Sequence, residues 1–97
     1  MRLSQQQCRF LSQTLHRHFG DDATCYIFGS RLDDNARGGD LDVFVETTRP
    51  TDYHQRARAL MQLQDAVNLP VDLVVKDPLD NERPIHAIAR LSGKRIT

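Results

Sequence analysis

Three short runs of apolar residues constrain the fold more than any other feature of this 97-residue chain. The runs are "ATCYIF" at 23–28, "LDVFVE" at 41–46 and "LPVDLVV" at 69–75. Their length and their β-branched and aromatic content predict buried strands. In the second run the odd-numbered residues are all aliphatic, so they should share one face of a sheet. The opposite face would then carry Asp42, Phe44 and Glu46.

Amphipathic segments predict three helices around these strands. The first spans 4–19, where Ser4 and Gln7 form a capping-box pattern. A second helix opens at Pro50 and Thr51, and a third opens near Pro84 and ends at Gly93. The side chains expected to face the core are Cys8, Leu11, Leu15 and Phe19 in the first helix, Tyr53, Ala57, Leu60, Gln64 and Val67 in the second, and Ile85, Ile88, Ala89 and Leu91 in the third.

The resulting order is helix, strand, loop, strand, helix, strand, helix. It predicts an α/β (α+β) fold in which helices pack against a small mixed sheet. The strand–helix–strand unit over 41–75 is typical of a crossover between parallel strands. The length suits a single domain over residues 1–97. The tail at 94–97 could either fray or dock on the sheet.

The charge balance limits the classes of partner. Thirteen basic and thirteen acidic residues give a formal net charge of zero, so neither nucleic acid nor a membrane surface is indicated. No signal-peptide pattern or membrane-length apolar run is present, which predicts a cytoplasmic protein. Cys8 and Cys25 lack metal-ligand spacing and are expected to be reduced and buried. The histidines expected at the surface are His16, His18, His54 and His86.

The segment "FGSRLDDNARGGDLDVFVE" at 28–46 concentrates glycine and charge between two strands. Asp40 and Asp42 are two residues apart at the start of the second strand, so both side chains leave the same face. Adjacent carboxylates repel unless a cation lies between them, and Mg²⁺ prefers oxygen ligands of this kind. The alternative is a chance pair of acidic residues on a surface strand.

Asp72 is the one charged residue in the apolar run of the third strand. An ionised carboxylate there is costly to bury unless it is paired or bound to a cation. If this strand lies beside the second one, Asp72 can join Asp40 and Asp42 in a site for two metal ions. The alternatives are an exposed position on the sheet or an ion pair with Arg31 or Arg37.

Gly29 and Ser30 follow the first strand directly. Glycine permits an unusual turn and close approach of a ligand, and a serine hydroxyl can bond a phosphate oxygen. The guanidinium groups of Arg31 and Arg37 match phosphate geometry. Each feature also has an ordinary explanation, because Gly-Ser is a common turn and either arginine could pair with Asp33 or Asp34.

The combination resembles the minimal nucleotidyltransferases of the DNA polymerase beta superfamily. The matching stretches are "FGSR", "RGGDLDVFVE" and "PVDLVV", and the order of elements matches over nearly the whole chain. Many members have Ser where Gly39 stands, and their Arg-Gly element comes earlier in the loop. The resemblance implies the polymerase beta palm-like fold.

The resemblance also implies an activity. Asp40, Asp42 and Asp72 would bind Mg²⁺ and catalyse transfer, while Gly29, Ser30, Arg31 and Arg37 would hold a nucleoside triphosphate. A hydroxyl would attack the α-phosphorus, most simply moving AMP from ATP. Minimal members are similar to antitoxins paired with helical HEPN toxins, so the acceptor could be a tyrosine of such a partner. The alternatives are a catalytically silent module that neutralises a partner by contact, and a nucleotide sensor without turnover.

Overall fold

The structure is a computed structural model that describes residues 3–29 and 41–97. Within these ranges, three helices and four strands follow the order expected from the sequence, with one short strand added at the end. Their bounds are α1 Gln5–Phe19, β1 Thr24–Phe28, β2 Leu41–Glu46, α2 Tyr53–Val67, β3 Val71–Lys76, α3 Pro84–Ser92 and β4 Lys94–Arg95.

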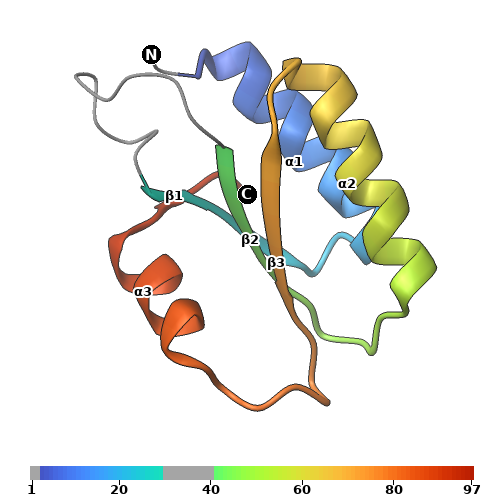
Figure 1. Cartoon of the computed structure of the whole chain (residues 1–97), viewed down its shortest axis with the longest axis vertical. Coiled ribbons are helices and arrows are strands. Elements are labelled where there is room, and N and C mark those ends of the chain that lie inside the picture. The colour runs from blue at the N-terminus through green and yellow to red at the C-terminus, as the bar shows by residue number, and fades with distance from the viewer. Residues whose placement is uncertain (1–2, 30–40) are drawn as a thin grey trace.

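The strands form one mixed sheet in the order β3-β2-β1-β4. β2 and β3 are parallel and are joined through α2, as the sequence predicts, whereas β1 is antiparallel to both β2 and β4. Helices α1 and α2 pack together over one face of the sheet, and α3 covers the other face (Figure 1). The predicted mixed sheet with helices packed against it is confirmed.

Successive side chains of β2 point to opposite faces of the sheet and so belong to two separate apolar clusters. The aliphatic residues Leu41, Val43 and Val45 are fully buried against α1 and α2. Phe44 is fully buried on the opposite face, in a smaller cluster with Phe28 and with Ala89 of α3. Because both faces of β2 are covered, this central strand is fixed in position, and the residues at its start are positioned with it.

Local capping defines where the first two helices begin. In α1 the Gln7 N–H donates to the Ser4 hydroxyl (3.0 Å), and the Ser4 N–H donates to Oε1 of Gln7 (2.8 Å). The predicted capping box is therefore confirmed. In α2 the equivalent pair is Asp52 and Gln55, two residues after Pro50.

The predicted inward face of α2 is confirmed in part and is wrong at Tyr53. Leu60 and Val67 pack against the core as expected. The helix buries Ala59 and Leu63, whereas Tyr53 is 81% exposed. Ala57 and Leu60 are only half-buried. The reason lies in the sheet, which ends at β3 and leaves the flank of α2 that carries Tyr53 without a strand beneath it. The end of the stripe that carries Tyr53 therefore lies at the open edge of the sheet.

The predicted packing of α3 is also wrong at two positions. Ile88 is 54% exposed and Leu91 is 86% exposed, while His86 and Ala89 are the buried residues of this helix. The expectation that His86 faces solvent is thus overturned. Its ring stacks on Phe44 at 5.5 Å between centroids, and its Nδ1 accepts the Arg83 N–H (3.0 Å).

The C-terminal tail docks on the sheet rather than fraying. Residues of β4 pair with Tyr26 and Ile27 of β1. The Cys25 N–H donates to the Thr97 hydroxyl (3.2 Å), and the Ile96 N–H donates to the Cys25 carbonyl (2.9 Å).

The two cysteines are free thiols. Cys25 is buried, as expected, and burial raises its pKa to about 12. Cys8, which was also expected to be buried, is only half-buried. No helix in the described ranges combines the length and the apolar character needed to cross a bilayer.

Candidate functional site

Gly29 and Asp42 meet where β1 ends and β2 begins. Phe28 is the register partner of Asp42, so the next residue, Gly29, lies beside the Asp42 carboxylate. Gly29 has φ +80°, and a Cβ built at this position would lie 2.1 Å from Oδ2 of Asp42. Any larger residue would therefore displace the Asp42 side chain, in addition to adopting a strained backbone. Glycine is required here because the carboxylate lies against the turn.

Asp42 and Asp72 are neighbours across the parallel strands. They are register partners in β2 and β3, so their side chains leave the same face of the sheet. Adjacent strands lie about 4.8 Å apart, which brings two such carboxylates within reach of one ion. Asp42 is half-buried and Asp72 is exposed. Two of the three predicted carboxylates are thus brought together beside Gly29.

The remaining predicted site residues are Asp40, Ser30, Arg31 and Arg37, and all four lie outside the described residues. Within 3–29 and 41–97, no group of three His, Cys, Asp or Glu side chains is arranged to hold a metal ion. The carboxylate oxygens of Asp42 and Asp72 are nevertheless the hard donors that Mg²⁺ prefers. The residues present therefore fit part of a magnesium site, to which Asp40 would add a third carboxylate.

The sheet under this site is held by aromatic and ionic contacts to α3. Phe44, two residues along β2 from Asp42, makes stacked ring contacts with both Tyr26 and His86. The guanidinium of Arg90 lies 5.8 Å from the centre of the Phe44 ring and bonds both Glu46 and Glu82. These two carboxylates raise the pKa of Arg90 above its ordinary value. The contacts fix α3 on β2 and so make the strand that carries Asp42 a rigid support.

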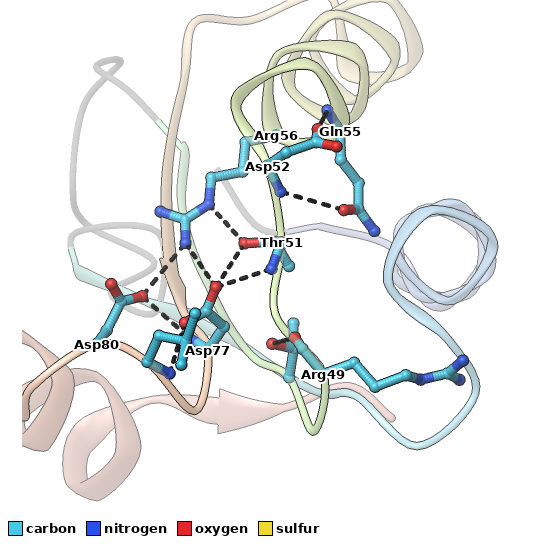
Figure 2. Close-up of polar contacts among 9 residues, drawn as sticks. Arg49, Thr51, Asp52, Gln55, Arg56, Asp77 and Asp80 are labelled. Atoms are coloured by element: carbon cyan, nitrogen blue, oxygen red, sulfur yellow. Dashed lines mark hydrogen bonds and ion pairs between the residues drawn. The ribbon is translucent and has the colours of Figure 1, made fainter.

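A second carboxylate cluster lies at the other end of β3, and sequence reasoning missed it. Asp77 is buried, and its Oδ2 accepts the N–H (2.8 Å) and hydroxyl (3.1 Å) of Thr51 and an N–H of Arg56 (3.3 Å) (Figure 2). Its Oδ1 accepts the Leu79 N–H (2.9 Å). The Thr51 N–H is the largest cause of a lowered pKa for Asp77.

Arg56 also bonds Asp80 (3.2 Å), so the cluster ties the start of α2 to the loop after β3. The sequence signal was the Asp-Pro pair at 77–78, which directly follows a strand. Every oxygen of Asp77 is bonded within the chain, so this cluster is structural.

Comparison with known proteins agrees with this geometry. The polymerase beta nucleotidyltransferase family matches residues 11–96. The comparison with curated proteins gives no match.

Solved structures share the fold at low identity. One is a tri-AMPylated HEPN toxin of Shewanella oneidensis in complex with an MNT antitoxin (TM-score 0.74, 22% identity, 97% of this chain and 72% of that chain). Another is a toxin–antitoxin structure with AMP-PNP (TM-score 0.75, 23% identity, 98% of this chain and 73% of that chain). A third is the toxin–antitoxin MntA–HepT (TM-score 0.75, 20% identity, 97% and 72%).

These likenesses confirm the fold, and the family match extends over most of the chain, including both aspartates of the candidate site. The chain belongs to the polymerase beta nucleotidyltransferase family.

Proposed function

We propose that this chain transfers AMP from ATP to a hydroxyl of a HEPN-type protein partner, as the antitoxin of a toxin–antitoxin pair. The adjacency of Asp42 and Asp72 beside Gly29, in a chain of this family, is the observation that carries the proposal. We assign catalysis and metal binding to Asp40, Asp42 and Asp72. Gly29, Ser30, Arg31 and Arg37 would hold the triphosphate, and residues 1–97 would act as one minimal domain.

The chemistry needs two things from these residues. Asp42 and Asp72 would hold Mg²⁺, which when bound neutralises phosphate charge and lowers the pKa of a bound hydroxyl. Gly29 would let the triphosphate approach the backbone, because it has no side chain there. The acceptor oxygen then bonds to the α-phosphorus while the bond to the bridging oxygen breaks. Pyrophosphate leaves, and the hydroxyl proton passes to Asp72.

The choice of nucleotide and partner is supported by the structural relatives. One of them contains an AMPylated HEPN toxin with its antitoxin, and another contains AMP-PNP. Both are less than 25% identical to this chain, so the adenine preference, the tyrosine acceptor and the partner remain proposals. The cytoplasmic location also stays a prediction.

The test is transfer of label from ATP to a HEPN-type partner. We expect label from the α-phosphate, and not from the γ-phosphate, to appear on the partner when Mg²⁺ is present. Asp42→Asn should slow the transfer by at least about a hundredfold. Asp65→Asn, the same change at an exposed position of α2, should leave it intact. Absence of label with the wild-type chain and every common nucleoside triphosphate would contradict the proposal.

A second candidate is a module that neutralises a partner by contact alone. The exposed Ile88 and Leu91 on α3 favour it, because apolar side chains at a surface suit protein contact. Under this alternative, Asp42→Asn would keep full neutralisation, while Leu91→Glu would lose it.

A further inference from the structure

Strand β3 has an open edge. The hydrogen bonds at the two ends of the β2–β3 pairing show which residues of β3 direct their backbone groups toward β2. The Leu41 N–H donates to the Pro70 carbonyl (2.9 Å), and the Thr47 N–H donates to the Lys76 carbonyl (2.9 Å). The N–H and C=O of one strand residue point to the same side, and successive residues alternate. The even-numbered residues of β3 therefore bond to β2, and the odd-numbered ones direct their backbone groups to the open edge.

The chain itself caps both ends of this edge. Oε1 of Gln64 accepts the Val71 N–H (3.1 Å), and Oδ2 of Asp80 accepts the Asp77 N–H (3.0 Å). Between them, Leu73 and Val75 present their N–H and C=O groups outward, and no strand among the described residues pairs with them. Unpaired backbone groups at the edge of a sheet are a template for a further strand.

An apolar groove follows the same edge. It has a volume of about 230 Å³ and lies between α2 and β3. Its walls are Tyr53, Arg56, Ala57 and Leu60 of α2 together with Leu73 and Val75 of β3. These α2 residues include part of the apolar stripe predicted from the sequence, in which Tyr53 is exposed and Ala57 and Leu60 are half-buried. The partly exposed stripe and the unpaired backbone groups therefore belong to one surface.

We propose that a second copy of this chain covers that surface by antiparallel pairing of the two β3 strands about Val74. This register places Leu73 opposite Val75 of the second copy, so the outward N–H and C=O groups of both residues are bonded. Shifting the pairing by two residues either way would use Val71 or Asp77, whose N–H groups are already capped. The two-fold axis places both α2 helices on the same side of the joined sheet, with their grooves facing each other.

The charges of β3 select the same register independently. Pairing about Val74 places Asp72 opposite Lys76 of the second copy, and symmetry creates this pair twice. In the described part of the chain, neither Asp72 nor Lys76 forms an ion pair. Glu46 lies beside Lys76 in β2 but bonds Arg90 instead. Opposite charges directly across an antiparallel pair are stabilising, whereas like charges are not.

Sedimentation equilibrium of the full chain from micromolar to millimolar concentration tests the proposal. We expect a monomer–dimer equilibrium that Lys76→Glu or Asp72→Lys alone weakens by about tenfold, because each makes both cross-strand pairs repulsive. The double variant Asp72→Lys with Lys76→Glu should restore dimerisation. A chain that stays monomeric at all concentrations overturns the proposal. A dimer whose dissociation constant is unchanged by the single substitutions, or is not restored by the double substitution, also overturns it.

Amide hydrogen exchange gives a second readout that does not depend on these charges. The Leu73 and Val75 amides should become protected as concentration rises, while the Val71 and Asp77 amides should be protected throughout. Leu73→Pro removes an outward N–H without touching the β2 ladder and should abolish dimerisation, whereas Leu73→Ala keeps the N–H and should retain it in part. Protection of Leu73 and Val75 that requires a different protein would overturn self-pairing. Because mass and exchange report no catalysis, failure here leaves the proposed function untouched.

Discussion

The two ends of β3 carry the same type of residue in opposite environments. Asp72, near the start of the strand, is exposed and forms no ion pair within the described ranges, and Asp42 of β2 is its register partner. Asp77, directly after the strand, is 3% exposed and accepts hydrogen bonds from Thr51, Arg56 and Leu79. Residue type alone therefore does not separate a candidate catalytic aspartate from a structural one.

The two carboxylates differ in whether the chain itself supplies hydrogen bonds to their oxygens. A buried carboxylate is tolerated only when its oxygens are bonded, and the chain bonds those of Asp77 itself. Asp72 is exposed beside Asp42, and within one copy of the chain the described residues give it no ion-pair partner. Its oxygens are therefore open to a metal ion or, in the dimer proposed above, to Lys76 of the second copy.

The largest effect should come from the first end. Asp42→Asn and Asp72→Asn should each slow AMP transfer by about 10²–10³-fold, because each removes charge that holds the metal and the developing transition state. Single-turnover rates with α-labelled ATP measure this loss. The double variant should be little worse than either single one, since both residues serve one site. Independent, multiplicative losses would contradict a shared site.

Gly29→Ala should come next, with an expected loss of about ten- to a hundredfold in transfer rate. The added Cβ would meet Oδ2 of Asp42 and move that carboxylate, and small displacements of catalytic groups are costly. Gly20→Ala is the matched control, because Gly20 also has a positive φ (+98°) but lies far along the chain from the site. Equal losses of activity in both variants would show that backbone strain, not the Asp42 carboxylate, is responsible.

Asp77→Asn should change stability and its pH dependence. Hydrogen bonds, above all from the Thr51 N–H, hold the pKa of Asp77 below its ordinary value of 3.8. Folding therefore favours the ionised form of Asp77. Its contribution to the stability of the fold is present above pH 3.8 and is lost as the pH falls below that value. We expect the variant to melt several degrees lower at neutral pH and to lose less stability between neutral and acid pH. Calorimetric melting curves over that range measure both effects, and parallel curves would contradict the assignment.

The smallest effect should come from Asp80→Asn. The Arg56–Asp80 ion pair is partly exposed on both sides (35% and 37%), and pairs of this kind contribute about 0.5 kcal/mol. The asparagine can still accept the Asp77 N–H through its amide oxygen. Urea unfolding measures the change, and a loss several times larger would mean that the cluster is more cooperative than its single bonds indicate.

Much of the fold could be predicted from the sequence because local signals agreed with burial. The Ser4–Gln7 capping box, the alternation in β2 and the strand–helix–strand unit over 41–75 all correspond to the structure. That Asp42 and Asp72 lie on neighbouring strands could also be expected, because a strand–helix–strand unit joins parallel strands of one sheet.

The errors arose where packing depends on the extent of the sheet. Tyr53 belongs to an apolar stripe, yet it is exposed because no strand among residues 3–29 and 41–97 lies beyond β3. His86 is polar, yet it is buried because Phe44 offers a ring to stack on and the Arg83 N–H supplies a hydrogen bond. Asp77 looked like an ordinary loop residue, because its donors come from distant Thr51 and Arg56 and leave no local pattern.

The most direct test of the contrast measures AMP transfer and melting temperature in the same preparations of Asp42→Asn and Asp77→Asn. Asp42→Asn should lose transfer while keeping a melting temperature close to that of the wild type. Asp77→Asn should melt earlier while still transferring AMP at a temperature where it is folded. Full transfer by Asp42→Asn, or loss of transfer by a folded Asp77→Asn, would contradict the assignment of catalysis to the carboxylates beside Gly29.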